Sequence, residues 1–417
     1  MIEWSIILFC LTLVIAIGQF VFVARFASGM KSFDDSSSDS YERPENWPTA
    51  SVILCVRGKD PSLEDCIQAV TNLDYPEFKL HIVLDHVNDP ASDLVNQLAA
   101  NQDNVVIHLL TDPSEQCSLK CSSIIQVISG LKDDVEIVAL VDADSVPHRN
   151  WLKSIAAGLG QPNTGLVSGV RCYTPGDSAL GSLIRYQWNS AAAVQMFAYR
   201  IPWGGTLALK MSTIKELDLL NKWGSAFCED TMLTQILRQK NLNACILPNL
   251  VMPNSESCGA SDYLAWASRQ LLTVRLYNSN WPLVVAHAFL TTFTMVTALA
   301  TLAFAITNQN PWAFYWCTAT LVLYMLSNWA MLISNQNSVD FQLRATGQYD
   351  KWLNASKRVA LFLIMPITQC FYFLALIQSF GRTVTWRQIS YEAKGPFDIH
   401  RGEHAVYSDN STGTDSL

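Results

Sequence analysis

The chain has 417 residues, and only 15% of them are charged, well below the quarter that is usual in water-soluble proteins. Its net charge of −8 argues against a nucleic-acid partner, because phosphate binding needs clustered Lys and Arg residues. The eleven cysteines are scattered and form no CxxC pair, which argues against a zinc site and indicates a reducing compartment.

The first predicted element is a membrane anchor near the N-terminus. Residues 6–23 form an apolar run long enough to cross a bilayer. A cleaved signal peptide is the alternative, but Glu3 precedes the run in place of a basic cluster, and basic residues follow it from Arg25 onward. These basic residues place the next domain in the cytosol. We therefore expect an uncleaved anchor over 1–28 and a flexible, Ser- and Asp-rich linker over 29–47.

A Rossmann-like α/β domain is predicted over residues 48–280. Residues 50–56 are a β-branched run of the kind that is buried on both faces of a sheet. Strand-like and helix-like segments then alternate, which predicts βαβ units in a doubly wound sheet with ligands at the carboxyl ends of its strands. Further strands are expected at 79–84, 105–110, 135–141 and 244–247, an apolar segment at 204–211, and helices at 92–100, 119–131, 228–240 and 261–276.

Three more membrane spans are predicted over residues 281–381. No Asp, Glu, Lys or Arg occurs between residues 276 and 339. Residues 283–307 and 312–333 are separated by a tight turn and form a hairpin, and residues 359–380 form the third span. A mildly amphipathic segment, residues 178–200, lies either along the membrane surface or in the core.

Basic residues predict the orientation of these spans. Arg344, Lys351 and Lys357 indicate a cytosolic loop near residues 335–357, which agrees with the orientation of the anchor. Counting the spans puts the C-terminal tail, residues 382–417, on the opposite side of the membrane. The Arg and Lys residues of the tail argue for the cytosolic side, so its side stays open.

The strongest chemical motif is Asp142-Ala-Asp144, at the end of a predicted buried strand. Two carboxylates at this spacing can share one hard cation, Mg²⁺ or Mn²⁺, and leave its other positions for water and substrate phosphates. The metal would neutralise the charge that develops on a nucleotide diphosphate as a sugar leaves. The alternative is a plain N-cap of the next helix.

Two other acidic loops are expected to face the same crevice. Asp85 and Asp89 follow the second strand, and we favour Asp89 as the acceptor of hydrogen bonds from the base or ribose of the donor. Capping of the next helix is the alternative for Asp89. Glu229 and Asp230 lie at a predicted helix start, where Asp230 could act as a general base, although capping would also explain the pair.

With these motifs in order, the sequence resembles the family 2 nucleotide-sugar glycosyltransferases of GT-A fold, and within them the ceramide glucosyltransferase-like branch. The motifs that carry the resemblance are CVRGKDPSLEDCIQAVTNLDYPEF, DHVNDPASD, the Asp-Ala-Asp motif, GGTLALKM followed by Cys-Glu-Asp, and VTWRQISY. The order of one anchor before the domain and three spans after it agrees as well.

The resemblance implies an inverting transfer of a sugar, glucose in that branch, from a UDP-sugar to a membrane lipid such as ceramide. It also implies a role for each matched residue, with Asp230 as the base and Lys120 near the donor diphosphate. The implied site consists of catalytic Asp230 and Glu229, metal-binding Asp142 and Asp144, and donor-binding Asp85, Asp89, Lys120, Asp142, Gln270 and Arg269.

The last motif of the family departs from the pattern in this chain. The family has Gln or Arg, two residues, and then Arg-Trp, whereas here Gln270 is followed by Thr273 and Val274 at the position of the pair. That pair is associated with the leaving diphosphate and the acceptor end. Either Arg269 or Arg275 therefore substitutes for it, or the acceptor differs.

Three alternatives stay open at this point. A processive polysaccharide synthase shares the fold and the carboxylates, but it needs a pore built from more membrane helices. A polyprenyl-phosphate sugar transferase would use the same donor. A non-catalytic membrane scaffold is supported only by the missing Arg-Trp pair. Both a bacterial inner membrane and a eukaryotic endomembrane fit the predicted location.

Overall fold

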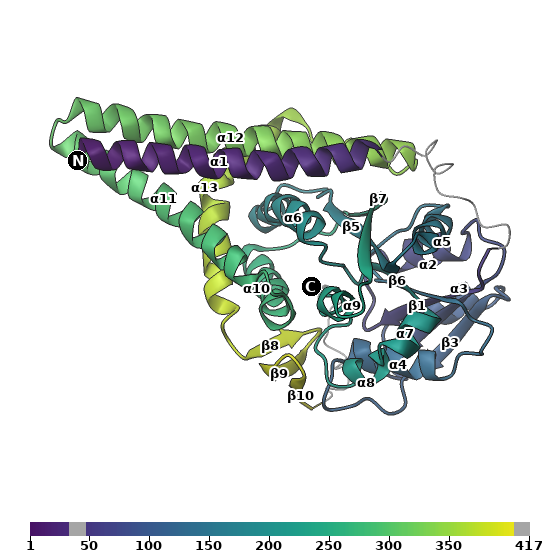
Figure 1. Ribbon diagram of the computed structural model, residues 1–417. Helices are drawn as coiled ribbons and strands as arrows, with labels where there is room; N and C mark the ends of the chain where they lie inside the picture. The colour runs from purple at the N-terminus through teal and green to yellow at the C-terminus, as the bar shows by residue number, and fades with distance from the viewer. Residues whose placement is uncertain (33–46, 404–417) are drawn as a thin grey trace.

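The chain folds into an α/β domain joined to a group of long helices (Figure 1). The structure is a computed structural model that describes residues 1–32 and 47–403. The first helix, α1 (Ile2–Ser32), continues past the predicted end of the anchor at residue 28. Four residues of the predicted linker are therefore helical, and most of the remaining linker lies outside the described residues.

A seven-stranded mixed sheet forms the centre of the α/β domain, in the order β3-β2-β1-β4-β6-β5-β7. β1 (Ala50–Val56) pairs in parallel with β2 (Phe78–Leu84) on one side and with β4 (Ile137–Val141) on the other. β6 (Thr206–Lys210) pairs antiparallel to β4, which makes the sheet mixed. The other strands are β3 (Val105–Leu109), β5 (Thr164–Tyr173) and β7 (Asn243–Asn254).

Helices cover both faces of this sheet, so its central strands are buried on both faces. Val52 and Leu54 of β1 belong to the core on one face, and Ile53 belongs to the core on the other. This burial explains the unbroken apolar sequence of β1. The covering helices are α2 (Leu63–Thr71), α3 (Ser92–Ala99) and α5 (Trp151–Gly160) on the first face, and α4 (Leu119–Ser129), α7 (Met211–Glu216), α8 (Leu219–Trp223) and α9 (Leu233–Arg238) on the second.

Two of the differences from the predicted elements concern β5 and α9. β5 has no predicted counterpart, because Gly165 and Gly169 interrupt its apolar pattern. A Cβ at Gly169 would lie 2.2 Å from the carbonyl oxygen of Leu250 on β7, so the glycine allows the two strands to approach closely. The predicted helix over residues 228–240 is much shorter, because α9 begins only at Leu233.

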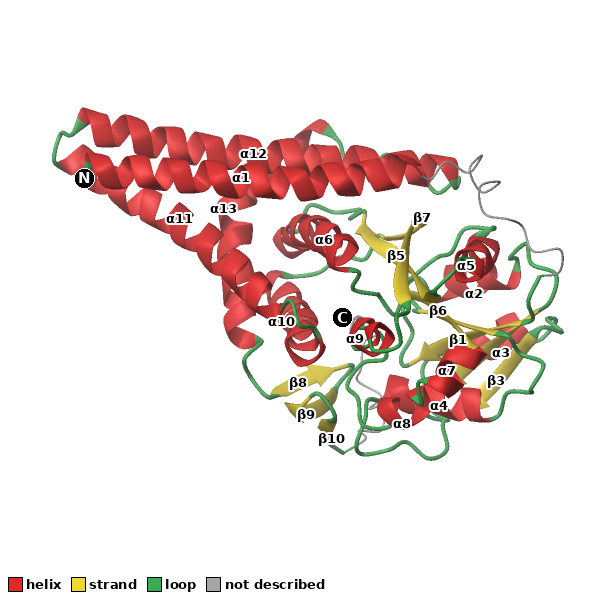
Figure 2. Cartoon of the chain, in the orientation of Figure 1, coloured by secondary structure: helices red, strands yellow, loops and turns green. Residues whose placement is uncertain are grey.

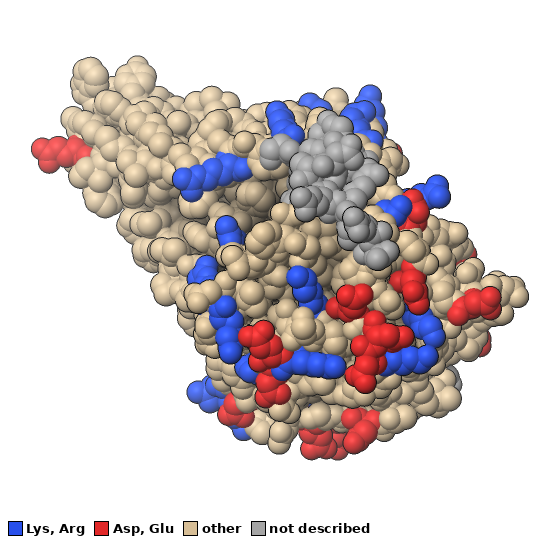
Figure 3. Space-filling view, turned by 45° about the vertical axis from the view of Figure 1, so that its right-hand side comes forward, with Lys and Arg blue, Asp and Glu red and all other residues tan. Residues whose placement is uncertain are grey.

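Among the described residues, four helices are long and apolar enough to cross a membrane, namely α1, α11 (Trp281–Thr307), α12 (Pro311–Ala345) and α13 (Ala355–Gln378). We call these four the long helices. α11 and α12 form the predicted hairpin, and α1 packs along α12. The arm formed by α1, α11 and α12 carries almost no charged side chains in Figure 3, whereas charges gather over the α/β domain. A bilayer around this arm requires such a separation of charge.

α12 extends beyond its predicted end at residue 333, to Ala345. Much of the predicted loop near residues 335–357 is therefore helical. The added turns are polar, because they pack on the α/β domain and not on lipid. For example, the amide Nδ2 of Asn335 donates to the carbonyl oxygen of Ser190 over 3.3 Å.

Two further helices lie between the sheet and the long helices. α6 (Leu180–Tyr199) packs against β5 and also against α1, α12 and α13. α10 (Ala260–Tyr277) packs against α6 and α13. The segment 178–200 therefore belongs to a buried junction between the α/β domain and the arm, in agreement with the core alternative.

The C-terminal region begins with a small antiparallel sheet (Figure 2). Its strands are β8 (Thr383–Trp386), β9 (Ile389–Gly395) and β10 (Asp398–Arg401), in the order β10-β9-β8. Arg387 and Gln388 connect β8 to β9 and both have positive φ, as a two-residue hairpin turn requires.

Candidate active site

A cavity of about 640 Å³ opens at the carboxyl ends of β1, β2 and β4 and continues between the long helices. Its polar wall includes Asp85, Lys120, Asp142, Asp144 and Asp230, and its apolar wall comes from α1, α11, α12 and α13. The predicted crevice at the strand ends is therefore connected to the interior of the helical arm.

Lys120 joins two of the three acidic loops. Its ammonium nitrogen lies 2.5 Å from Oδ1 of Asp142 and 2.6 Å from Oε1 of Glu229. Burial by itself lowers the pKa of Lys120, but the two carboxylates more than offset this, so its pKa lies well above the ordinary value. A charged Lys120 thus fixes the end of β4 against the loop that contains Glu229.

Glu229 is a buried positioning group in this arrangement. Burial raises the pKa of Glu229 above its usual value, although Lys120 opposes the shift. The backbone carbonyl of Glu229 accepts a hydrogen bond of 3.0 Å from the indole Nε1 of Trp223. A Cβ at Gly204 would lie 1.9 Å from the Glu229 carboxylate, so only glycine fits there.

Asp230 faces the cavity and is oriented by three donors. The backbone amide of Gly204 donates to Oδ2 over 2.8 Å, and the amide and hydroxyl of Thr231 donate to Oδ1 over 2.5 and 2.9 Å. The helix that follows, α9, begins three residues later and has only six residues. Asp230 therefore lies before the helix and not at its predicted start, and these local hydrogen bonds orient its carboxylate.

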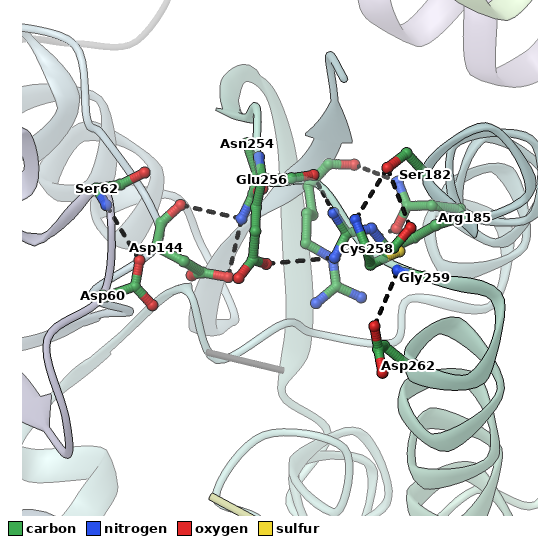
Figure 4. Close-up of polar contacts among 12 residues, drawn as sticks. Asp60, Ser62, Asp144, Ser182, Arg185, Asn254, Glu256, Cys258, Gly259 and Asp262 are labelled. Atoms are coloured by element: carbon green, nitrogen blue, oxygen red, sulfur yellow. Dashed lines mark hydrogen bonds and ion pairs between the residues drawn. The ribbon is translucent and has the colours of Figure 1, made fainter. Parts of the chain in front are cut away.

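Asp144 is connected to the far side of the cavity through Asn254 at the end of β7 (Figure 4). Asn254 Nδ2 donates to Asp144 Oδ2 over 3.0 Å, and Asn254 Oδ1 accepts from the amide of Glu256 over 2.9 Å. Glu256 in turn forms an ion pair of 3.2 Å with Arg185 of α6. Burial raises the pKa of Asp144 to about 6, and the carboxylates of Asp142 and Asp60 add to the shift.

A metal ion at this site would have few protein ligands. Within residues 1–32 and 47–403, no group of three or more His, Cys, Asp or Glu side chains is placed to hold one. Asp142 and Asp144 both line the cavity and carry the oxygen ligands that Mg²⁺ and Mn²⁺ prefer. The two residues fit a divalent ion that takes its other ligands from water and substrate phosphates.

The loop after β2 brings only one of its two predicted residues to the cavity. Asp85 lines the cavity and pairs with Arg57. Asp89 is buried and absent from the described cavity wall, and its carboxylate accepts from the amides of Gly58 and Ala91 over 3.0 and 2.8 Å. These hydrogen bonds join the loop after β2 to the loop after β1. The role of Asp89 as a donor ligand stays a prediction, and Asp85 is the better placed of the two residues.

The structure brings an arginine and a tryptophan together although the family pair is missing. Cζ of Arg269 lies 5.2 Å from the ring centroid of Trp386 on β8, and both residues line the cavity. Burial lowers the pKa of Arg269 to about 10, with a contribution from Arg387. Arg275 instead donates to the carbonyl oxygen of Phe380 and does not line the described cavity, so Arg269 is the better placed substitute.

Several residues of the site carry no signal in the sequence. Arg171 stacks against Trp266 at 4.8 Å and donates to Oε1 of Gln270 over 3.5 Å. It lies on β5, a strand that was not predicted. Arg387 forms an ion pair of 3.0 Å with Asp60. The sequence motif that contains Arg387 was recognised, but its ion pair with Asp60 was not. The two residues lie more than 300 positions apart, and no spacing along the chain indicates such a contact.

The comparisons with known proteins agree with this geometry. The sequence matches the profile of Glycosyl transferase family 21 over residues 8–396. Glycosyltransferase AglE of Haloferax volcanii is 28% identical over 124 residues, which are 29% of this chain and 39% of AglE. The probable glycosyltransferase YdaM of Bacillus subtilis is 24% identical over 204 residues, 46% of this chain and 47% of YdaM. The chain spans less than half the length of these curated relatives.

One solved structure aligns over most of the chain. It is a mannosyltransferase from Pyrobaculum calidifontis in complex with GDP-Man and Mn²⁺, which is 17% identical and has a TM-score of 0.47. The alignment covers 89% of this chain and 99% of that protein.

The sequence match places the chain in the glycosyltransferase class, and its apolar helices suit a membrane. The chain belongs to Glycosyl transferase family 21, because the family profile covers nearly its whole length. The predicted α/β GT-A architecture, with one apolar helix before the domain and three after it, is confirmed. Membership of this family favours an enzyme over the non-catalytic scaffold.

Proposed function

We propose that this protein transfers a sugar from a UDP-sugar to a hydroxyl group of a membrane lipid, with inversion at the anomeric carbon. The observation that carries the proposal is the continuity of the cavity. One cavity is lined by Asp144 and Asp230 at one end and by apolar helices at the other. A water-soluble acceptor would need no such apolar extension, whereas a lipid needs a place for its chains.

The donor end of the cavity is suited to a nucleotide diphosphate. Asp142 and Asp144 would hold Mg²⁺ or Mn²⁺, which would neutralise charge on the leaving diphosphate. Burial raises the pKa of Asp144, and the carboxylates of Asp142 and Asp60 add a repulsion of the kind that a bound cation relieves. Arg269, stacked on Trp386, supplies a positive charge on the same wall of the cavity. Asp85 is available to the base or ribose of the donor.

At the same polar end of the cavity, Asp230 is the group placed to accept a proton from the acceptor. The lipid oxygen forms a bond to the anomeric carbon, the bond from that carbon to the diphosphate breaks, and the hydroxyl proton passes to Asp230. Displacement in one step inverts the carbon. The three hydrogen bonds to Asp230 keep its carboxylate oriented during this step.

A neutral lipid fits the apolar end better than the other two acceptors. The residues that the long helices contribute to the cavity wall include Gln19, His287, Thr291 and Gln369 but no Asp, Glu, Lys or Arg. A polyprenyl phosphate would bring a negative charge with no basic partner on these helices. A processive synthase would need a channel through more helices than the four of the described chain.

We place the α/β domain on the cytosolic side of the membrane. Arg25 and Lys31 follow the apolar part of α1, and Arg344 ends α12, close to the α/β domain. Basic residues at the ends of spans favour the cytosolic side. Nucleotide sugars in that compartment would then reach the cavity directly.

The function is tested by supplying the purified protein with a panel of radiolabelled nucleotide sugars, a total lipid extract and either Mg²⁺ or Mn²⁺. We expect label from a UDP-sugar in one neutral lipid, identified by chromatography and mass spectrometry. Label in an acid-labile lipid phosphate or in a water-soluble polymer would contradict the proposed acceptor. Label from a GDP-sugar alone would contradict the proposed donor.

A substitution on α1 tests the lipid end of the cavity. Gly18 lines the cavity, and a Cβ there would meet nothing within 4 Å. We expect Gly18→Trp to fill the lipid path and lower the rate of lipid labelling by about 10²-fold, because displacement of the acceptor by even 1 Å is costly. Binding of the UDP-sugar, measured by calorimetry, should be unchanged.

Ile17→Trp is the matched control for this experiment. Ile17 is the adjacent residue of α1, is 58% exposed, and does not line the described cavity. Its replacement should leave lipid labelling intact. Equal losses in the two variants would show that the effect comes from membrane insertion and not from the cavity.

A further inference from the structure

The start of α13 is bonded to the α/β domain. Lys357, in its first turn, donates through Nζ to the carbonyl oxygens of Pro175 and Gly176 over 2.7 and 3.0 Å. These two residues follow β5. In the loop before α13, Gln348 Nε2 donates to the carbonyl oxygen of Val146 over 2.7 Å, close to the acidic motif. This end of the helix therefore lies against the α/β domain.

The other end of α13 is bonded to the same domain. Arg275, at the end of α10, donates to the carbonyl oxygens of Phe380 and Gly381 over 3.1 and 2.8 Å. The small sheet that follows is fixed by the ion pair between Arg387 and Asp60, at 3.0 Å. All of these contacts join the two ends of α13 to the part of the chain that carries the sheet β1–β7.

Between its ends, α13 packs along the two helices that adjoin the α/β domain. It contacts α6 and α10, and Gln187 of α6 donates to the carbonyl oxygen of Leu361 over 2.6 Å. The hydroxyl of Thr368 donates to Gln187 Oε1 over 2.5 Å. Figure 1 shows α13 running across α1 and α12 and not alongside them.

The path of the chain also places both ends of α13 beside the α/β domain. α1 enters the α/β domain, α11 leaves it, and α12 returns to it, since Gln342 near the end of α12 donates to the carbonyl oxygen of Met30 near the end of α1. α13 has 24 residues, a length of about 36 Å, which would suffice to cross a bilayer. A crossing would carry β8–β10 away from the domain to which they are bonded.

We infer that α13 does not cross the bilayer but lies along its surface, on the same face as the α/β domain. The exposed side of α13 supports this position. Its apolar side chains fall within a sector of about 80° at 3.6 residues per turn. They are Val359, Leu363, Ile367, Cys370, Leu374 and Ile377, which we call the exposed stripe. An in-plane helix buries such a stripe in the adjoining lipid leaflet.

The leaflet is the occupant that the surroundings of the exposed stripe indicate. α13 packs against α11, whose own exposed side chains, such as Phe289 and Phe293, are apolar. The stripe is therefore continuous with the lipid-facing surface of the arm. The opposite side of α13 contributes Met365, Gln369 and Tyr372 to the cavity wall. The helix thus separates the cavity from the surface of the bilayer.

This placement resolves the opposing indications for the C-terminal region. The span count that includes α13 puts residues from 382 onward across the membrane from the α/β domain, whereas the Arg and Lys residues there indicate the same side. With α13 in the plane of the membrane, only α1, α11 and α12 cross. The basic residues of β8–β10 then lie on the same face as the α/β domain.

Depth-dependent quenching tests the inference on the full chain in liposomes. A fluorescent amino acid is introduced by codon suppression at Val359, Ile367 or Ile377, and quenchers are attached at shallow or deep positions of the lipid acyl chains. We expect the shallow quencher to be the more effective at all three positions. Strongest deep quenching at Ile367 would show a crossing helix, and no quenching at any position would show that the stripe is not in lipid. Either result overturns the inference.

α11 provides the matched control for this experiment. Leu283, Phe293 and Ile306 are all exposed and follow one another along a helix that we take to cross the bilayer. From Leu283 to Phe293 to Ile306, the more effective quencher should change from the shallow one to the deep one and back to the shallow one. This pattern confirms that the quenchers report depth.

A second measurement fixes the side of the C-terminus. One epitope tag is appended after Leu417 and another is inserted at Gln309, in the turn between α11 and α12. In sealed vesicles, we expect the first tag to be accessible together with the α/β domain and the second to be accessible only from the opposite side. Access to both tags from one side would overturn the inference. Neither measurement depends on sugar transfer, so this inference and the proposed function can fail separately.

Discussion

Replacement of Asp230 by Asn should lower the turnover of sugar transfer by about 10²- to 10⁴-fold and leave donor binding almost unchanged. The amide has the shape of the carboxylate and can still accept hydrogen bonds from Gly204 and Thr231, but it cannot take the proton of the acceptor hydroxyl. The measurement compares the kcat for lipid labelling with the Kd for the UDP-sugar, obtained by calorimetry.

Two other substitutions make this result specific. Asp133→Asn, at a fully exposed surface position, should leave both quantities intact. Glu229→Gln should weaken donor binding as well as turnover, because Glu229 holds Lys120 beside Asp142. A loss of binding in Asp230→Asn as large as its loss of turnover would assign Asp230 to the donor and remove it from the proton transfer.

The parts of the fold that the sequence predicts well depend on local pattern. β1 has its predicted bounds, and β2, β3 and β4 lie within two residues of theirs, because each is a short run rich in apolar and β-branched residues. Asp142, Asp144 and Asp85 reach the cavity for the related reason that parallel strands end at one edge of the sheet. Local sequence therefore suffices for the acidic part of the site.

The parts that were missed depend on contacts between distant segments. Asn254 bonds Asp144 from the end of β7, and Trp386 reaches Arg269 from a hairpin beyond the long helices. No spacing along the chain encodes such contacts. Asp89 shows the same limit, because its carboxylate accepts from the amide of Ala91 in its own turn and also from the amide of Gly58 in the distant loop after β1.

Hydropathy also leaves the route of an apolar helix undetermined. The composition of α13 satisfies the length and hydropathy criteria for a span. A helix that lies in the membrane plane and one that crosses it can have the same composition. Contacts with distant residues, such as the bonds at both of its ends at Lys357 and at Phe380, are what favour one route over the other.

The substitution Asp144→Asn should abolish metal-dependent transfer without unfolding the protein. A metal ion supplies several kcal/mol of charge stabilisation in such reactions, so we expect turnover to fall by about 10²-fold or more. The effect of this substitution on the thermal stability of the protein should differ from its effect on turnover. Burial raises the pKa of Asp144 to about 6, with Asp142 and Asp60 adding to the shift, so its ionised form at neutral pH is held against unfavourable surroundings. Loss of this charge should leave the Tm unchanged or raise it slightly.

Titration of Mg²⁺ or Mn²⁺ in the transfer assay measures the effect of the substitution on turnover. Thermal unfolding of the same samples measures its effect on the Tm. The hydrogen bond from Asn254 can persist, because the amide oxygen of Asn is also an acceptor. Full turnover at the same metal concentration would remove Asp144 from the metal site. A marked fall in Tm would instead show that its carboxylate is needed to hold β7 at the edge of the cavity, since Asn254 is the contact that connects them.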